Sequence, residues 1–191
     1  MPEERMLERR RFCQLGAIAA GSLLVPAVGQ AQRIEIPVPE GNQASLESAP
    51  RRPGPNNVEA DARVLFDALK ADSPEAGMGF FIPQDVFRAV KGISDPDALH
   101  ARMIRLFERD VHELHAELGE NAADAEFLRF EFSRRRGWVG LREESNRLPY
   151  WAQRHNWLYY RVGEREHRFE VRTMISWGDH WYITHLSEFR R

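Results

Sequence analysis

The sequence predicts an α+β fold in which N-terminal helices pack on a curved antiparallel sheet. Apolar residues recur at helical spacing as far as Leu118, and they alternate with polar residues from Phe127 onwards. The later segments are joined by short turns at Gly163-Glu164 and Gly178-Asp179, which are typical of hairpins. Strands do not alternate with helices, so a parallel dinucleotide-binding fold is excluded.

Three helices are expected in the first half of this domain. The first follows the possible cap Asn56-Asn57 and ends near residue 73, with apolar residues at helical spacing at Val58, Ala62, Leu65, Phe66 and Leu69. A short helix over 84–91 stops at Gly92. The third starts after Asp95-Pro96, with proline at its first position, and ends at Gly119. The apolar segment 80–83 should plug into the core.

Four strands are expected in the second half, over 127–132, 156–162, 165–177 and 180–189, and the second of them can begin as early as Tyr150. Tight turns between them predict an antiparallel meander. The order of elements over residues 57–191 is similar to that of the cone-shaped NTF2-like fold, and a cystatin-like grip of a sheet around a helix is the near alternative. An NTF2-like cone implies a pocket whose inward polar residues carry the catalytic chemistry.

Residues 1–31 have the three parts of a signal peptide. Basic residues precede an uncharged stretch over 15–28, and small residues follow it up to Ala31. The order Arg9-Arg10-Arg11-Phe12 resembles the twin-arginine (Tat) signal, although Glu8 and Cys13-Gln14 depart from the usual pattern. The resemblance implies export in the folded state through the Tat translocase, to a periplasmic or secreted location. The general secretory route is the alternative.

The uncharged stretch is too short for a permanent membrane anchor. Cys13 lies before that stretch, whereas a lipoprotein cysteine would follow it, and it is the one cysteine of the chain. The mature chain therefore has no thiol. Residues 32–56 contain five prolines, which disfavour helices and strands, so this segment is expected to be a disordered linker. Residues 57–191 then form a single domain.

The composition excludes several classes of protein. The chain has 191 residues, is 42% hydrophobic and 29% charged, and carries a net charge of -2, which fits a globular protein and gives no positive field for nucleic acid. Of the 27 basic residues only Lys70 and Lys91 are lysines. The arginines are dispersed along the chain, so we interpret their excess as codon bias. No phosphate-binding loop and no G-x-S-x-G elbow occurs.

His100 and Asp110 interrupt the apolar stripe of the third helix. Buried there, an imidazole and a carboxylate would have shifted titration and could serve as catalytic acid and base. They lie about 15 Å apart along the helix axis, so they do not touch directly. The alternative is structural, with each group paired to the backbone or to an arginine. Expected partners are the sheet arginines Arg129, Arg161 and Arg172.

His112 and His115, with Glu108 on the same facet of the third helix, could hold zinc. No fourth ligand is evident in the sequence, so an ordinary solvated face is the alternative. We therefore expect neither a metal nor a cofactor, and a metal-carrying protein is the third functional hypothesis.

All five tryptophans and all four tyrosines lie between Trp138 and Tyr182. An aromatic concavity on the sheet could bind a small molecule, a glycan or a peptide, with Trp151, Tyr159, Trp181 and His185 as the expected contacts. The alternative is that these rings form the core. The leading hypothesis is an exported, non-catalytic binding or envelope-accessory domain, monomeric or dimeric. A small NTF2-like lyase, isomerase or hydrolase using Asp110 and His100 is the alternative.

Overall fold

The computed structural model describes residues 36–187. Over this part the fold is α+β, as predicted, and the predicted signal peptide lies outside the described residues. The helices are α1 (Val58–Lys70), α2 (Pro74–Gly77), α3 (Gln84–Val90) and α4 (Pro96–Leu118). The strands are β1 (Glu126–Glu131), β2 (Arg136–Val139), β3 (Tyr150–Val162), β4 (Arg165–Trp177) and β5 (His180–His185). Short 3₁₀ turns occupy Glu40–Asn42, Met78–Phe80, Gly119–Ala122 and Glu143–Ser145.

The strands form one open antiparallel sheet in the order β1-β3-β4-β5. β3 is long enough to pair with two short strands on the same edge: β2 lies beside its first half and β1 beside its second half. The turns after β3 and β4 contain Gly163 (φ 59°) and Gly178 (φ 58°), a left-handed conformation that glycine adopts without steric cost. These two turns confirm the predicted hairpins.

β2 was not expected, because its four residues are too few to show an alternating pattern. It begins at Arg136, beyond the end of the strand that was expected over 127–132. The last strand is also shorter than expected, since it ends at His185.

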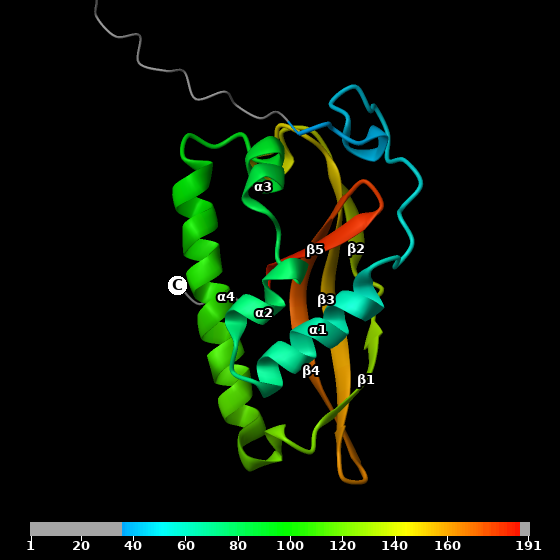
Figure 1. The fold of residues 1–191 in the computed structure, drawn as a ribbon. Helices are drawn as coiled ribbons and strands as arrows, with labels where there is room; N and C mark the ends of the chain where they lie inside the picture. Colours follow the sequence, from blue (N-terminus) through cyan, green and yellow to red (C-terminus); the bar gives the residue numbers. More distant parts are fainter. Residues whose placement is uncertain (1–35, 188–191) are drawn as a thin grey trace, which may run out of the picture. The chain divides into compact units, whose positions relative to one another are not determined.

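The helices attach to the sheet through separate contacts (Figure 1). α1 contacts β1, and its Phe66 ring lies 5.4 Å from the Tyr160 ring of β3. α4 contacts β5 and α3. The segment Phe80–Ile82 is fully buried, as predicted, and the Ile82 N–H donates to the Ile183 carbonyl of β5 at 3.0 Å. This plug therefore ties the helical half of the domain to its last strand.

The predicted caps have different outcomes. Asp95 caps α4 as expected, because its Oδ1 accepts a hydrogen bond from the Ala98 N–H at 2.9 Å. Asn57 does not cap α1 with its side chain. Its amide instead bonds both backbone groups of Trp181, accepting from the N–H and donating to the carbonyl, each at 2.9 Å. Asn57 thus joins the start of α1 to β5.

The prediction of a disordered linker is wrong over residues 36–56. This segment has little regular structure, in keeping with its prolines, but it packs against the sheet. Asn42 is 1% exposed, and its side chain donates to the carbonyls of Pro149 and Ser176 and accepts from the Gly178 N–H. The backbone carbonyls of Pro50 and Gly54, in the same segment, accept hydrogen bonds from the indole N–H groups of Trp151 and Trp181. Residues 36–56 are thus held by hydrogen bonds between side chains and backbone groups, and not by the backbone pairing of a strand. The compact unit therefore starts before residue 57.

Candidate functional site

A cavity of about 280 Å³ lies between the sheet and helices α3 and α4. The size approaches that of pockets that bind small molecules. Two helices, three strands and the loop before β3 line it: Phe87 and Lys91 at α3, Leu99 and Met103 on α4, Glu144 in the loop, Tyr150, Ala152 and Arg154 on β3, Thr173 and Ile175 on β4, and Thr184 and His185 on β5. The register explains how the strand residues meet, because Ala152 pairs with Ile175 and Arg154 with Thr173.

One end of this cavity carries a hydrogen-bonded ionic cluster of Lys91, Glu144, Tyr150 and Arg154. The Tyr150 hydroxyl donates to Oε2 of Glu144 at 2.9 Å, and Nη2 of Arg154 donates to Oε1 at 2.7 Å. The Lys91 ammonium donates to the Glu144 carbonyl (3.1 Å), to Oδ1 of Asn146 (2.9 Å) and to the Tyr150 hydroxyl (3.4 Å). The cluster therefore holds two cations and one carboxylate.

The loop that carries Glu144 is strained and firmly anchored. Arg142, Glu144 and Ser145 have φ values of 66°, 47° and 60°, which are uncommon for residues other than glycine. Backbone hydrogen bonds of 2.8 Å join this loop to the end of α3, from the Gly92 N–H to the Ser145 carbonyl and from the Arg147 N–H to the Val90 carbonyl. These bonds hold the left-handed residues in place.

Burial shifts the titration of three groups in the wall. It lowers the pKa of Lys91, an effect that Glu144 partly opposes. Burial and then the Glu144 carboxylate raise the pKa of Tyr150, so the phenol stays protonated. Burial and then Lys91 lower the pKa of His185, which favours the neutral imidazole near pH 7.

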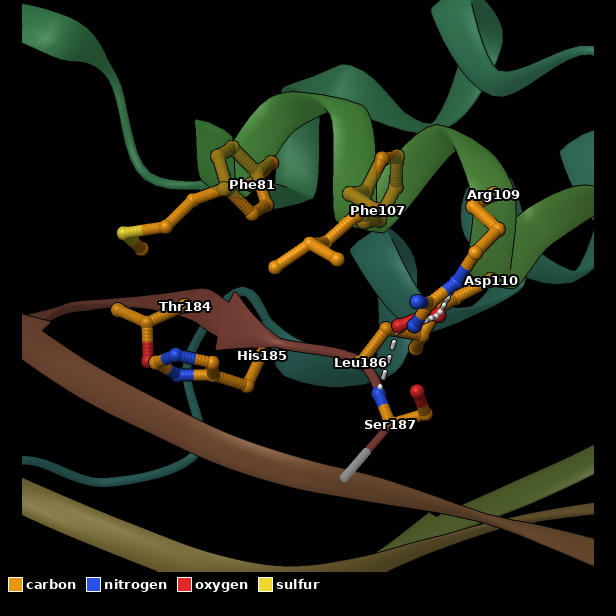
Figure 2. A pocket seen from close by; sticks show the side chains of 10 residues that line it. Phe81, Phe107, Arg109, Asp110, Thr184, His185, Leu186 and Ser187 are labelled. Carbon is orange, nitrogen blue, oxygen red and sulfur yellow. Dashed lines mark hydrogen bonds and ion pairs between the residues drawn. The ribbon is translucent and has the colours of Figure 1, made fainter. Parts of the chain in front are cut away.

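Asp110 is buried but does not reach this cavity. Figure 2 shows it on α4 beside Arg109 and facing the backbone of Ser187. Its Oδ1 lies 2.6 Å from Nη2 of Arg109, and its Oδ2 accepts the Ser187 N–H at 3.1 Å. The space beside it is about 10 Å³, room for about one water molecule. The expected sheet-arginine partner was wrong, because the neighbouring residue on the same helix supplies the guanidinium.

His100 has a structural environment of its own. Nε2 lies 2.8 Å from the Ile82 carbonyl, and the rings of Phe81 and Phe87 lie 5.8 and 5.4 Å from the imidazole. This is the backbone pairing that the structural alternative expected. His100 and Asp110 share no hydrogen-bond partner, so the geometry does not bring them together as an acid-base pair.

Of the four expected ligand contacts, only His185 lines the cavity. Trp181 is fully buried, and its indole N–H donates to the Gly54 carbonyl. Trp151 donates to the Pro50 carbonyl and packs edge-on against Trp138. Tyr159 lies under the Arg129 guanidinium, 3.8 Å from the ring centroid. These three aromatic residues therefore do not form one concavity.

The two histidines of the expected zinc facet, His112 and His115, make separate hydrogen bonds. Nδ1 of His112 lies 2.6 Å from Oδ1 of Asp72, and Nδ1 of His115 lies 2.9 Å from the Leu69 carbonyl. Within residues 36–187 no three side chains of the types that bind metals come together.

Sequence reasoning missed Lys91, Glu144, Tyr150 and Arg154. One signal was available, because Lys91 is one of two lysines in a chain that otherwise uses arginine for its basic residues. A lysine ammonium is compact and is readily shifted in pKa by burial, unlike a guanidinium. The other three residues gave no signal, because their convergence depends on the loop over 140–147.

No protein-family model, no curated protein and no solved structure matches this chain. Among the described residues, no helix combines the length and the apolar character needed to cross a bilayer. Function is therefore inferred from the chemistry of the cavity.

Proposed function

We propose that this chain is an exported, non-catalytic binding domain that holds one small, partly apolar molecule in the cavity between α3, α4 and the sheet. The observation that carries the proposal is that the cavity wall has an apolar part and an ionic end. Apolar side chains of Phe87, Leu99, Met103 and Ile175 form part of it, and the ionic cluster forms one end. Pockets for small molecules combine an apolar lining with a few convergent polar groups.

The volume sets the size of the ligand. A six-carbon amphiphile such as hexanamide fits within 280 Å³. Burying its five CH₂ and CH₃ groups yields about 4 kcal/mol, at about 0.8 kcal/mol per group. That free energy corresponds to a dissociation constant of roughly 1 mM. A natural ligand that also pairs with the ionic cluster would bind more tightly.

The test is a titration of ¹⁵N-labelled protein with hexanamide, followed by NMR. The amide signals of Lys91, Ala152 and His185 should shift saturably. Ala152→Leu, which adds volume inside the cavity, should abolish these shifts. Ala101→Leu adds the same volume on the exposed side of α4 and should leave them unchanged. Shifts that survive in the Ala152→Leu protein, or that never saturate, would contradict binding in this cavity.

The export part of the proposal is supported by the pattern Arg9-Arg10-x-Phe12 alone. Its test is fractionation of bacterial cells that express the full chain. The wild-type protein should appear in the periplasm in a shortened form, and replacement of Arg9 and Arg10 by lysine should retain it in the cytoplasm. Unchanged export of the double variant would favour the general secretory route.

An enzyme that uses the same cavity is the second candidate function, and Lys91 favours it. A partly buried lysine with a lowered pKa beside a tyrosine hydroxyl can add to a carbonyl carbon. The amine nitrogen bonds to the carbon of an aldehyde, water leaves to give an imine, and added cyanoborohydride reduces the imine to a secondary amine. With butanal, Lys91 should be modified about tenfold faster than Lys70 if its nucleophile is activated in this way. Equal labelling, measured by peptide mass spectrometry, would remove this candidate.

A further inference from the structure

We propose that the ligand of this cavity is a carboxylate, and that the side chain of Glu144 competes with it for Arg154 and Tyr150. This inference rests on the proposed function and specifies its ligand class. In the structure the Glu144 carboxylate already makes the contacts that a ligand carboxylate would make: a guanidinium N–H at 2.7 Å and a phenol O–H at 2.9 Å.

The charge of the cavity end favours an anion. Lys91 and Arg154 contribute two positive charges and Glu144 one negative charge, while the lowered pKa of His185 keeps that imidazole neutral near pH 7. One positive charge is therefore in excess. A ligand carboxylate near Lys91 would neutralise the excess positive charge. If that carboxylate took the place of Glu144 beside Arg154, it would also accept a charge-assisted hydrogen bond from the guanidinium.

Glu144 can leave without unfolding the loop. Its side chain is 49% exposed and that of Arg154 is 37% exposed, so their ion pair is partly hydrated and weak. The loop is held by its backbone bonds to Val90 and Gly92 and by the bond from Lys91 to the carbonyl of Glu144. None of these bonds uses the Glu144 carboxylate. Rotation of one side chain into solvent is therefore enough to release the phenol and the guanidinium.

The backbone conformation of Glu144 also supports this inference. It has a φ of 47°, between Arg142 and Ser145, which are left-handed as well. Such a conformation costs free energy for a residue with a side chain, and it persists where the surrounding structure imposes it. Here it places residue 144 beside the cavity. Neighbouring Glu143 differs, because its Oε2 accepts the Gly140 N–H at 3.1 Å and does not line the cavity.

The first test compares two probes of equal length on the wild-type protein at pH 7.5, hexanoate and hexanamide, by NMR titration. Hexanoate should bind about tenfold more tightly, as expected for one charge-assisted contact in a partly buried site. Equal affinity, or tighter binding of hexanamide, would overturn the carboxylate inference while leaving the proposed function intact. If neither probe binds, the proposed function itself fails.

The second test uses variants. Glu144→Gln keeps the size of the side chain and removes the competing charge, so hexanoate affinity should rise about fivefold while hexanamide affinity stays within twofold. Glu143→Gln, the matched control from the same loop, should change neither affinity. Arg154→Gln should abolish the preference for hexanoate. An unchanged or reduced hexanoate affinity in Glu144→Gln, with its fold verified by circular dichroism, would contradict competition by Glu144.

Discussion

Replacing Asn42 with alanine should destabilise the protein by about 3 kcal/mol, because one short side chain makes three hydrogen bonds, two of them buried and one partly buried. Its Nδ2 donates to the Pro149 carbonyl at 2.9 Å and to the Ser176 carbonyl at 3.2 Å, and its Oδ1 accepts the Gly178 N–H at 2.8 Å. Each net bond contributes about 1 kcal/mol. The alanine leaves the three backbone groups unpaired at a site that is 1% exposed in the native protein.

The assay is equilibrium unfolding in urea, monitored by tryptophan fluorescence. A loss of about 3 kcal/mol also corresponds to a fall in melting temperature of roughly 9 °C for a domain of this size. Gln43→Ala is the matched control, since Gln43 is exposed and no hydrogen bond of its side chain is seen in the structure. The control should change the free energy of unfolding by less than about 0.5 kcal/mol.

A loss below about 1 kcal/mol for Asn42→Ala, similar to that of the control, would refute this reasoning. It would mean that residues 36–56 do not contribute to the stability of the domain. They would then behave as the flexible linker that their proline content predicts.

Three further predictions concern single side chains. His155 has a φ of 58° inside β3, so His155→Gly should be about 1 kcal/mol more stable than His155→Ala in urea unfolding, and the reverse order would show that the backbone is not strained there. Asp110→Ala removes a buried carboxylate that pairs with the partly exposed Arg109 and accepts the Ser187 N–H, and it should cost about 2 kcal/mol, whereas Glu113→Ala, at an exposed position, should cost less than about 0.5 kcal/mol; similar losses would contradict this. The pKa of His185 is lowered in the folded state, so the unfolded chain takes up the proton first as pH falls below the ordinary value of 6.5, and stability present above that pH is lost below it. His185→Gln should flatten this part of the stability profile between pH 8 and 5, and an unchanged profile would contradict the shift.

Local sequence signals predicted the framework of the fold. The stripe along α4, its cap at Asp95 and its end at Gly119 are encoded within the helix itself, and the hairpins at Gly163 and Gly178 are encoded in their turns. The packing of residues 36–56 was missed for a physical reason. Asn42 is held by backbone groups more than a hundred residues away, and no local pattern reports such a bond.

The candidate site was predicted only in part, at His185. His185 was expected as a ligand contact, and it lines the cavity. Glu144 and Tyr150 could not be predicted, because a loop brings them beside Lys91. The left-handed residues of that loop are not glycines, so nothing in the sequence indicates its conformation. The tryptophans were expected to line a ligand concavity, but their position in the sequence does not decide this, since large rings fill a core as readily as they line a binding surface.

Because residues 36–56 pack against the domain, the proposed cleavage after Ala31 would lie close to folded protein. If a peptidase cuts after Ala31, only the four residues 32–35 separate the cut from the first described residue of the domain. Even a fully stretched chain of four residues reaches no more than about 14 Å. A membrane-bound peptidase acting on already folded cargo would therefore have to work close against the surface of this domain, and a bulky loop added near residue 36 should slow maturation.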